Sequence, residues 1–333
     1  MIIGKRFGFL ASVCVLISLS ALAYGLPSKA PKVSTINAFE GKPANIQITG
    51  DWVVVVQKPS IGSEFIAAYN IVTGKGYVIF EGSPSGGEIS AGGACAIWGT
   101  GKNSNKRFFD GLGIEDPRKG RSGLVWFDLT TWEYRSPEGA QGDLQPSVCG
   151  NLIAWTSIQQ IYMADINNGS RLQISSSSSR SKQHPRIKNG LVVWTELHGI
   201  NWRAYGYDIE KAEEFAITNE KDGSSSPPRT DGKTVVWSSN GIMAYDVKSG
   251  SKSKVADGFN PDIDNGIIVY VREIKDAVPK PSPRPPKRYN LFCKVLATKE
   301  ESLIAADIPA QYPSICNGRI AWVKNDKIYV TQL

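Results

Sequence analysis

Histidine is nearly absent from this 333-residue chain, which contains only His184 and His198. A Ser-His-Asp triad would have to use one of these two residues, and the G-x-S-x-G turn that presents the nucleophile of many hydrolases does not occur. The five cysteines form no C-x-x-C pair, which argues against a zinc cluster. The sequence therefore contains no motif that identifies an enzyme.

Long apolar runs are also lacking, except at the N-terminus. Lys5 and Arg6 precede an apolar stretch, Phe7–Leu22, and Ala21-Leu22-Ala23 has the small-residue pattern of a signal-peptide cleavage site. No second apolar segment of about 18 residues follows. We therefore expect a signal peptide over residues 1–23, a linker over 24–32 and a mature protein that is secreted, periplasmic or on the cell surface, with no transmembrane span after cleavage. An uncleaved anchor is the alternative.

What the sequence does contain is an internal repeat. A proline-led phrase runs through an Asn-Gly or Asp-Gly turn into a β-branched run that ends in an aromatic residue. Clear copies are Pro146–Trp155, Pro185–Trp194, Pro228–Trp237, Pro261–Tyr270 and Pro313–Trp322, and looser copies are Asn45–Val55 and Glu88–Trp98. The ends of successive copies lie 33 to 57 residues apart, which brackets the length of a propeller blade. The repeat predicts an all-β, seven-bladed β-propeller over residues 33–333, with six blades as the alternative.

Each copy predicts two strands joined by a tight turn, and a third strand with a Tyr-x-Asp-like phrase and a short fourth strand follow. The last copy ends after its third strand, Lys327–Leu333. The missing fourth strand resembles Val33–Gly41, near the other end of the chain. Because an open ring would expose unpaired strand edges, we expect Val33–Gly41 to pair with the last blade and close the ring.

These repeats resemble the TolB-type propeller repeat family, in which an Asn/Asp-Gly turn is followed by an apolar strand and then by a Tyr-x-x-Asp strand. The resemblance covers roughly Val33 to Leu333. Oligogalacturonate lyases, which share this type of propeller, hold manganese with a cluster of histidines, and two histidines cannot supply that set. We therefore expect no metal and no cofactor.

Four cysteines lie outside the N-terminal segment: Cys95, Cys149, Cys293 and Cys316. Neighbouring blades would favour the disulfides Cys95–Cys149 and Cys293–Cys316. Cys95 and Cys293 stand within apolar strand phrases, where a buried free thiol behaves as a small hydrophobic residue. Both states remain open at this point.

The positive charge is concentrated in two inserts, one after Trp98 and one after Tyr270, and each carries a net charge of +3. Both inserts join the second strand of a blade to its third strand, so they emerge on the face where the inner strands begin. The second insert, Val278–Arg288, is rich in proline and is expected to be extended. The candidate partner-binding residues are Lys102, Lys106, Arg107, Arg118, Lys119, Arg121, Lys280, Arg284, Lys287 and Arg288.

The inner-strand starts supply a candidate ligand site, since repeat symmetry places them around one mouth of a central channel. The candidate residues are His184, Arg186, Arg229, Asp262, Asn260 and Tyr312. Arginine offers bidentate geometry for a carboxylate, uronate or phosphate, and we expect Asp262 to pair with one arginine. A hydrated channel with structural ion pairs is the simpler interpretation.

The other repeated residues are expected to have structural roles. The third-strand residues Asp128, Asp165, Asp208 and Asp246 are expected to bond turns, and the repeated tryptophans are expected to wedge between blades. Trp126, Trp132 and Trp202 fall outside that register and are expected nearer the surface.

Taken together, the sequence favours a monomeric, non-enzymatic scaffold that binds an envelope or extracellular protein or an anionic polymer through its basic loop face. A carbohydrate-active lyase or hydrolase acting at the channel mouth is the alternative. Nucleic-acid binding fits the pI of about 9.0 but not the expected compartment.

Overall fold

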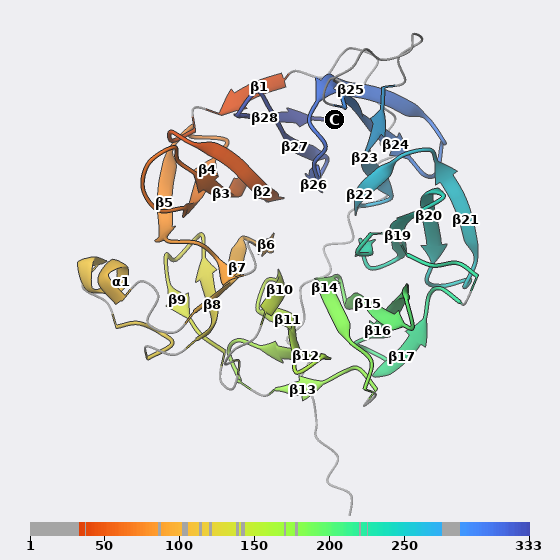
Figure 1. The fold of residues 1–333 in the computed structure, drawn as a ribbon, viewed down its shortest axis with the longest axis horizontal. Coiled ribbons are helices and arrows are strands. Elements are labelled where there is room, and N and C mark those ends of the chain that lie inside the picture. The colour runs from red at the N-terminus through yellow and green to blue at the C-terminus, as the bar shows by residue number, and fades with distance from the viewer. Residues whose placement is uncertain are drawn as a thin grey trace, which may run out of the picture.

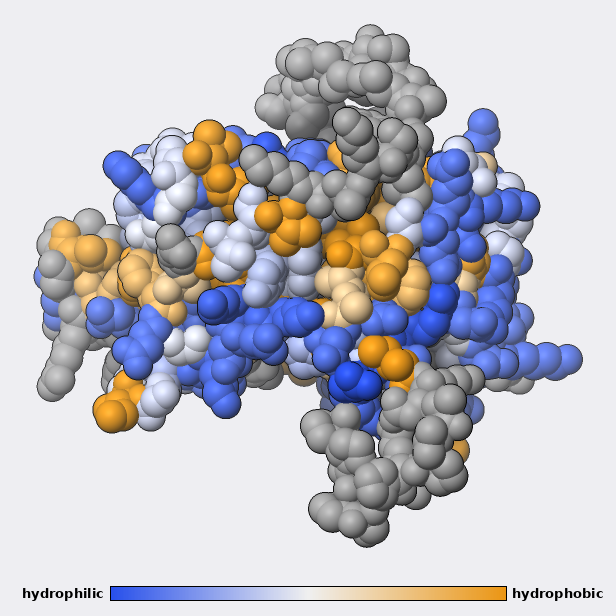
Figure 2. Space-filling view, turned by 90° about the horizontal axis from the view of Figure 1, so that it is seen from above, coloured by the Kyte–Doolittle hydropathy of each residue, from blue (hydrophilic) through white to orange (hydrophobic). Residues whose placement is uncertain are grey.

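The computed structural model describes residues 33–36, 38–85, 88–101, 106–112, 115–119, 122–137, 140, 144–169, 171–176, 179–219, 221–224, 226–274 and 287–333. Within these residues the strands form seven four-stranded antiparallel sheets, arranged around a common axis (Figure 1). Seen edge-on, the body is a disc that is wider than it is thick (Figure 2). The predicted all-β fold and the count of seven blades are confirmed.

The blades follow one another along the chain, and each runs from an inner strand to an outer one. Blade one holds β2 (Lys42–Thr49), β3 (Trp52–Lys58), β4 (Phe65–Asn70) and β5 (Gly76–Glu81). Blade two holds β6 (Ile89–Gly92), β7 (Cys95–Thr100), β8 (Gly123–Asp128) and β9 (Tyr134–Arg135). Blade three holds β10 (Leu144–Cys149), β11 (Leu152–Ser157), β12 (Gln160–Asp165) and β13 (Leu172–Gln173). Blade four holds β14 (Lys182–Lys188), β15 (Leu191–His198), β16 (Asn201–Asp208) and β17 (Glu213–Ala216).

Blade five holds β18 (Arg229–Thr230), β19 (Thr234–Ser239), β20 (Gly241–Asp246) and β21 (Lys252–Ala256). Blade six holds β22 (Phe259–Asp264), β23 (Ile267–Glu273), β24 (Tyr289–Val295) and β25 (Glu301–Ile308). Blade seven holds β26 (Ser314–Cys316), β27 (Arg319–Lys324), β28 (Lys327–Gln332) and β1 (Val33–Ile36). We call the face that carries the second-to-third loops and the starts of the inner strands the insert face, and the opposite face the turn face.

Blade seven is completed by a strand from the other end of the chain. β1 pairs antiparallel with β28, from Val33 opposite Thr331 to Ile36 opposite Ile328. This pairing confirms the predicted ring closure, and it leaves no sheet among the described residues with fewer than four strands.

The hydrophobic core lies between blades rather than within them. Seven buried clusters are found in the described chain, and each joins side chains of two neighbouring blades. Trp98, Trp155, Trp194 and Trp237 are fully buried, and Trp155, Trp194 and Trp322 stack on a tyrosine of the adjacent third strand. The repeated tryptophans are therefore wedges, as predicted. The expectation that Trp126 lies near the surface is wrong, because this side chain is 2% exposed and its indole donates to Gly150 O.

The third-to-fourth turns explain the repeated aspartates. Asp128 Oδ1 accepts hydrogen bonds from the amides of Thr130 and Thr131, and Asp208 Oδ1 accepts them from the two amides that follow in the same way. Short acidic side chains bond the backbone of such turns more readily than other residues do. The predicted structural role of these acids is confirmed.

The insert of blade two is partly folded. Helix α1 (Lys106–Leu112) places Phe109 in the core, and Arg118 pairs with Asp116 at 2.9 Å and donates to Gly101 O. Arg118 is only 5% exposed because its side chain lies inside this loop. Its burial does not favour the predicted role in partner binding.

The structure decides between the two cysteine states that the sequence leaves open. Cys95, Cys149, Cys293 and Cys316 are all free thiols, and burial raises the pKa of Cys95 to about 12.

In the described part of the chain no helix has the length and apolar character needed to cross a membrane. The predicted signal peptide and linker, residues 1–32, lie outside the described residues.

Removing residues 327–333 should open the ring. This deletion takes away the partner of β1 and the buried side chain of Ile328, a loss of about 2–5 kcal/mol for that side chain alone. We expect lower thermal stability and aggregation through the exposed edge of β27, measured by thermal unfolding and size-exclusion chromatography. A matched deletion of residues 279–286, which lie between β23 and β24, should leave a stable monomer. Equal stability of the two variants would contradict the closure mechanism.

Candidate functional site

The inner strands bend where they start, on the insert face. Asn45, Gln145, His184 and Asn260 hold equivalent positions in four blades and have φ values of 48°, 57°, 55° and 53°. The strand register shifts at each of them, as it does at a β-bulge. Bulges commonly re-aim side chains at the ends of strands. We call the seven equivalent positions the rim; they are Asn45, Glu88, Gln145, His184, Pro227, Asn260 and Tyr312.

In four blades the residue two places after the rim position links neighbouring blades. Ser90 Oγ accepts the amide of Val148 at 3.3 Å, and Ser147 Oγ accepts the amide of Ile187 at 3.0 Å. Asp262 and Ser314 make the same bond to the amides of Ile315 and Ile48. These four side chains act as staples between the inner strands of consecutive blades.

Arg186 and Arg229 occupy two of the staple positions, in adjacent blades four and five. Neither makes the staple bond. The Arg186 guanidinium instead lies 3.9 Å from a carboxylate oxygen of Glu88, and the Arg229 guanidinium stacks over the ring of Tyr312 at 5.6 Å. Nη1 of Arg229 is buried and has no hydrogen-bond partner among the described residues.

Glu88 is the member of this site that the sequence interpretation missed. Its carboxylate lies 3.1 Å from Nδ1 of His184, although the two residues stand in blades two and four. Trp98 corresponds to Trp194 in the repeat, and Glu88 therefore corresponds to His184, but Glu88 was not included in the candidate site.

The charges of the site depend on one another. Burial acts to raise the pKa of Glu88, but the hydrogen bond from His184 and the charges of Arg186 and Arg229 outweigh it, so the pKa lies below its usual 4.5. Burial and the neighbouring Arg229 lower the pKa of Arg186 to about 10, which leaves it charged at neutral pH. The two guanidinium groups thus act on one another and on the carboxylates of Glu88 and Asp262.

A second set of charges lies deeper along the axis, toward the turn face. Lys188 Nζ contacts Asp264 Oδ1 at 2.6 Å, and the other oxygen of Asp264 accepts the amide of Asn317 at 2.6 Å. Burial acts to lower the pKa of Lys188, but Asp264 and Asp262 raise it overall. This set is fully paired and holds blades four, six and seven together.

The remaining predicted site residues are placed as follows. Asn260 donates to Gln311 O at 3.0 Å and is part of the rim structure. Asp262 acts as a staple, and its charge also reaches Arg186, although no direct ion pair with an arginine forms. Lys119 is exposed, while Lys287 pairs with Glu273 and Arg288 with Asp307. The predicted partner-binding residues Lys102, Arg121, Lys280 and Arg284 lie outside the described residues, and only the backbone of Lys106 and Arg107 is described.

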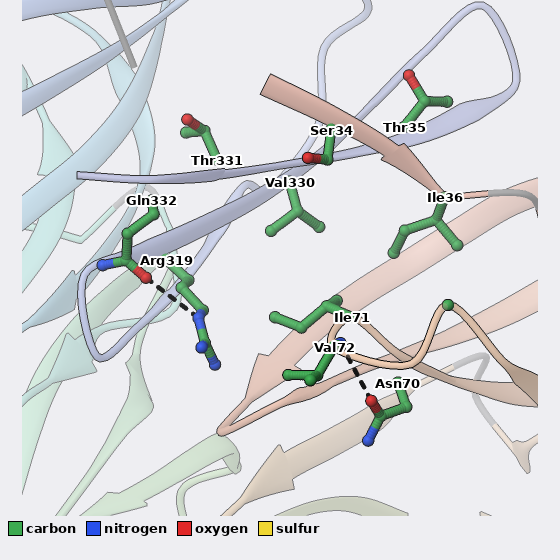
Figure 3. A pocket seen from close by; sticks show the side chains of 11 residues that line it. Ser34, Thr35, Ile36, Asn70, Ile71, Val72, Arg319, Val330, Thr331 and Gln332 are labelled. Carbon is green, nitrogen blue, oxygen red and sulfur yellow. Dashed lines mark hydrogen bonds between the residues drawn. The ribbon is translucent and has the colours of Figure 1, made fainter. Parts of the chain in front are cut away.

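A groove of about 440 Å³ lies elsewhere, between blade seven and blade one (Figure 3). Ser34 and Ile36 of β1 line one side, and Ile71 and Val72 line the other. Its one cation, Arg319, already donates to Gly50 O at 2.8 Å and to Gln332 at 3.1 Å. The groove therefore offers fewer unsatisfied donors than the rim does.

Metal-ligand clusters are not found in the described part of the chain, where no three His, Cys, Asp or Glu residues gather with a suitable geometry.

The fold is shared with solved propellers of different kinds. The tricorn protease matches 91% of this chain with a TM-score of 0.58 and 13% identity, and the match spans about a third (34%) of the protease chain. Oligogalacturonate lyase in complex with manganese matches with a TM-score of 0.56 and 12% identity, over 92% of this chain and 94% of that one. TolB from Acinetobacter baumannii is also among the neighbours, with a TM-score of 0.44 and 14% identity over 86% of this chain and 78% of that one.

No family model matches the chain, and no curated protein matches its sequence. Identities this low show the shared fold alone.

Replacing Glu88 with glutamine should destabilise the ring in a pH-dependent way. A carboxylate whose pKa is lowered by folding stabilises the folded state above its unfolded pKa, here 4.5, and that contribution is lost as the pH falls through the folded value. We expect Glu88→Gln to cost about 1–3 kcal/mol at pH 7. The melting temperatures of wild type and variant should converge at acid pH. A difference that stays constant between pH 7 and pH 3 would contradict the pairing.

Proposed function

We propose that this chain is a non-catalytic binding propeller that works outside the cytoplasm and holds an anionic group of its partner at the rim, between Arg186 and Arg229. The observation that carries the proposal is the use of two staple positions for arginines. Blades two, three, six and seven use this position to bond the next blade. Blade one has Gln47 there, which donates to Ile46 O of its own strand, and blades four and five have the two arginines, whose like charges act on one another.

The two arginines repel each other, and a bound anion would relieve this repulsion. Arg229 lowers the pKa of Arg186, so the two guanidinium groups repel each other, while the negative charges of Glu88 and Asp262 act in the opposite direction. A carboxylate, uronate or phosphate could accept the unused donor of Arg229 and lie against the ring of Tyr312. Groups whose charges are perturbed in this way gather at functional sites more often than elsewhere.

The compartment rests on the N-terminal sequence, which has the charge, apolar core and cleavage pattern of a signal peptide. The partner is an acidic protein or an anionic polymer. The sequence places the two basic inserts on the same face, where they would attract such a partner over the screening length of about 10 Å at 0.1 M salt.

An enzymatic alternative is favoured by one contact. The 3.1 Å pair of Glu88 and His184 orients an imidazole beside two arginines, which is an arrangement suited to proton abstraction next to a carboxylate. A carbohydrate-active enzyme at this rim would turn over an anionic polysaccharide, and loss of turnover in His184→Gln would establish it in place of simple binding.

Changing Arg186 and Arg229 to serine should separate binding from stability. Serine already serves as the staple in blades two, three and seven, and the repulsion between the two guanidinium groups is removed, but Glu88 loses two neighbouring positive charges, so the double variant should stay folded and lose about 1–3 kcal/mol of stability. Its affinity for polygalacturonate or polyglutamate should fall at least about tenfold, because charged hydrogen bonds contribute roughly 1.5–3 kcal/mol each. Calorimetric titration at several salt concentrations measures the loss.

Ser147→Ala is the matched control. It removes the bond to the amide of Ile187 and should lower stability by about 1 kcal/mol while leaving the affinity unchanged. If the arginine variant binds as wild type does, or if only Ser147→Ala affects binding, the rim is not the binding site.

A further inference from the structure

Three isoleucines are almost completely exposed to solvent. Ile61, Ile158 and Ile200 are 92%, 88% and 94% exposed, which exceeds every other large hydrophobic side chain in the described residues. Each stands at the tip of the loop between the second and third strands of its blade, in blades one, three and four. Because these loops all emerge on the insert face, the three side chains project from one face of the disc.

The same loop of blade two adds a fourth apolar residue. Leu112, at the end of α1, is 51% exposed. Trp202 is half-buried at the start of β16, two residues after Ile200. Four consecutive blades therefore present apolar side chains at equivalent positions.

The fold does not require these residues. None of the three isoleucines belongs to a core cluster of the described chain. Ile158 and Gln159 form a two-residue turn with φ values of 45° and 63°, a conformation that favours Asn-Gly and disfavours a β-branched side chain. Blade seven fills the same turn with Asn325 and Asp326.

Single exposed hydrophobic residues are common on protein surfaces and need no explanation. The three isoleucines differ in two respects, since they are the most exposed and they recur at one loop on one face. Exposed aliphatic residues elsewhere, such as Val72 and Leu172, are less exposed and lie toward the turn face or on outer strands.

The arrangement fits a lipid surface better than a protein. Side chains that are about nine-tenths exposed are not packed against one another, so they form no continuous patch of the kind that protein partners bury. A lipid surface accepts separate apolar tips wherever they enter it, and a half-buried tryptophan suits its interface. Exposed cations on the same face, including Lys119, Arg180 and Lys287, would meet anionic headgroups.

We propose that the insert face docks on an anionic lipid membrane, with Ile61, Ile158 and Ile200 entering the boundary between headgroups and acyl chains. These tips come from blades one, three and four, so docking brings that half of the insert face to the membrane. It shares a face with the rim but does not depend on Arg186 or Arg229.

Vesicle flotation tests the proposal. The protein lacking residues 1–23 is used, so that the apolar N-terminal stretch does not contribute. It should float with vesicles of phosphatidylcholine and phosphatidylglycerol, and less with phosphatidylcholine alone. The variant Ile61→Ser, Ile158→Asn, Ile200→Ser should partition at least about tenfold less, since each isoleucine contributes to apolar insertion. Its thermal stability should equal or exceed that of wild type, because Asn suits the turn at position 158.

A matched variant carries Val72→Ser, Leu172→Ser and Leu303→Ser, at side chains that are 69%, 46% and 52% exposed. It should float as wild type does, and the isoleucine variant should keep the wild-type affinity for polygalacturonate, which separates this proposal from the rim's function. Docking is overturned if wild type ignores anionic vesicles, if the isoleucine variant floats equally, or if the matched variant loses as much. Isoleucine-dependent binding to a purified protein without vesicle binding would assign the face to a protein partner instead.

Discussion

The structure depends on packing between neighbouring blades. A four-stranded sheet of this size has no interior of its own, and the buried clusters all join two blades. In six of the seven contacts an aromatic side chain of one blade, such as Trp98 or Trp194, lies against the preceding blade. Staples such as Ser147 add hydrogen bonds nearer the axis. Stability in such an array is close to a sum of neighbour contacts.

That dependence makes the exceptions informative. Where a staple is replaced by arginine, the lost bond is tolerated because the aromatic wedges of the same blades, Trp194 and Trp237, remain fully buried. The ring can therefore carry polar, mutually repelling groups at its axis and irregular loops on one face without losing its core. A rigid scaffold with variable loops and mouth residues suits a binding protein, and the same scaffold also supports enzymes.

The fold was predictable because its signals are local and repeated. Asn-Gly turns, alternating apolar runs and the Asp-led turns each specify a short piece of backbone, and the repetition removes ambiguity. The site was only partly predictable. Glu88 was missed because the repeat gives its position but not its contact with His184 across the ring, and the burial of Arg118 follows from Asp116 and Phe109 of the same insert, which contact it. Contacts between blades two and four depend on the diameter of the ring, which no local pattern records.

The contact between blades seven and one differs from the other six. It has Val55 where the others place an aromatic wedge, and a groove opens beside β1. The strands that meet there are separated by nearly the whole chain, with Val33 opposite Thr331. During synthesis β1 is made before β28, its partner in blade seven. The ring therefore stays an open arc until the final residues have been added. The pairing of β1 with β28 is therefore the single step that converts an open arc with two exposed strand edges into a closed ring.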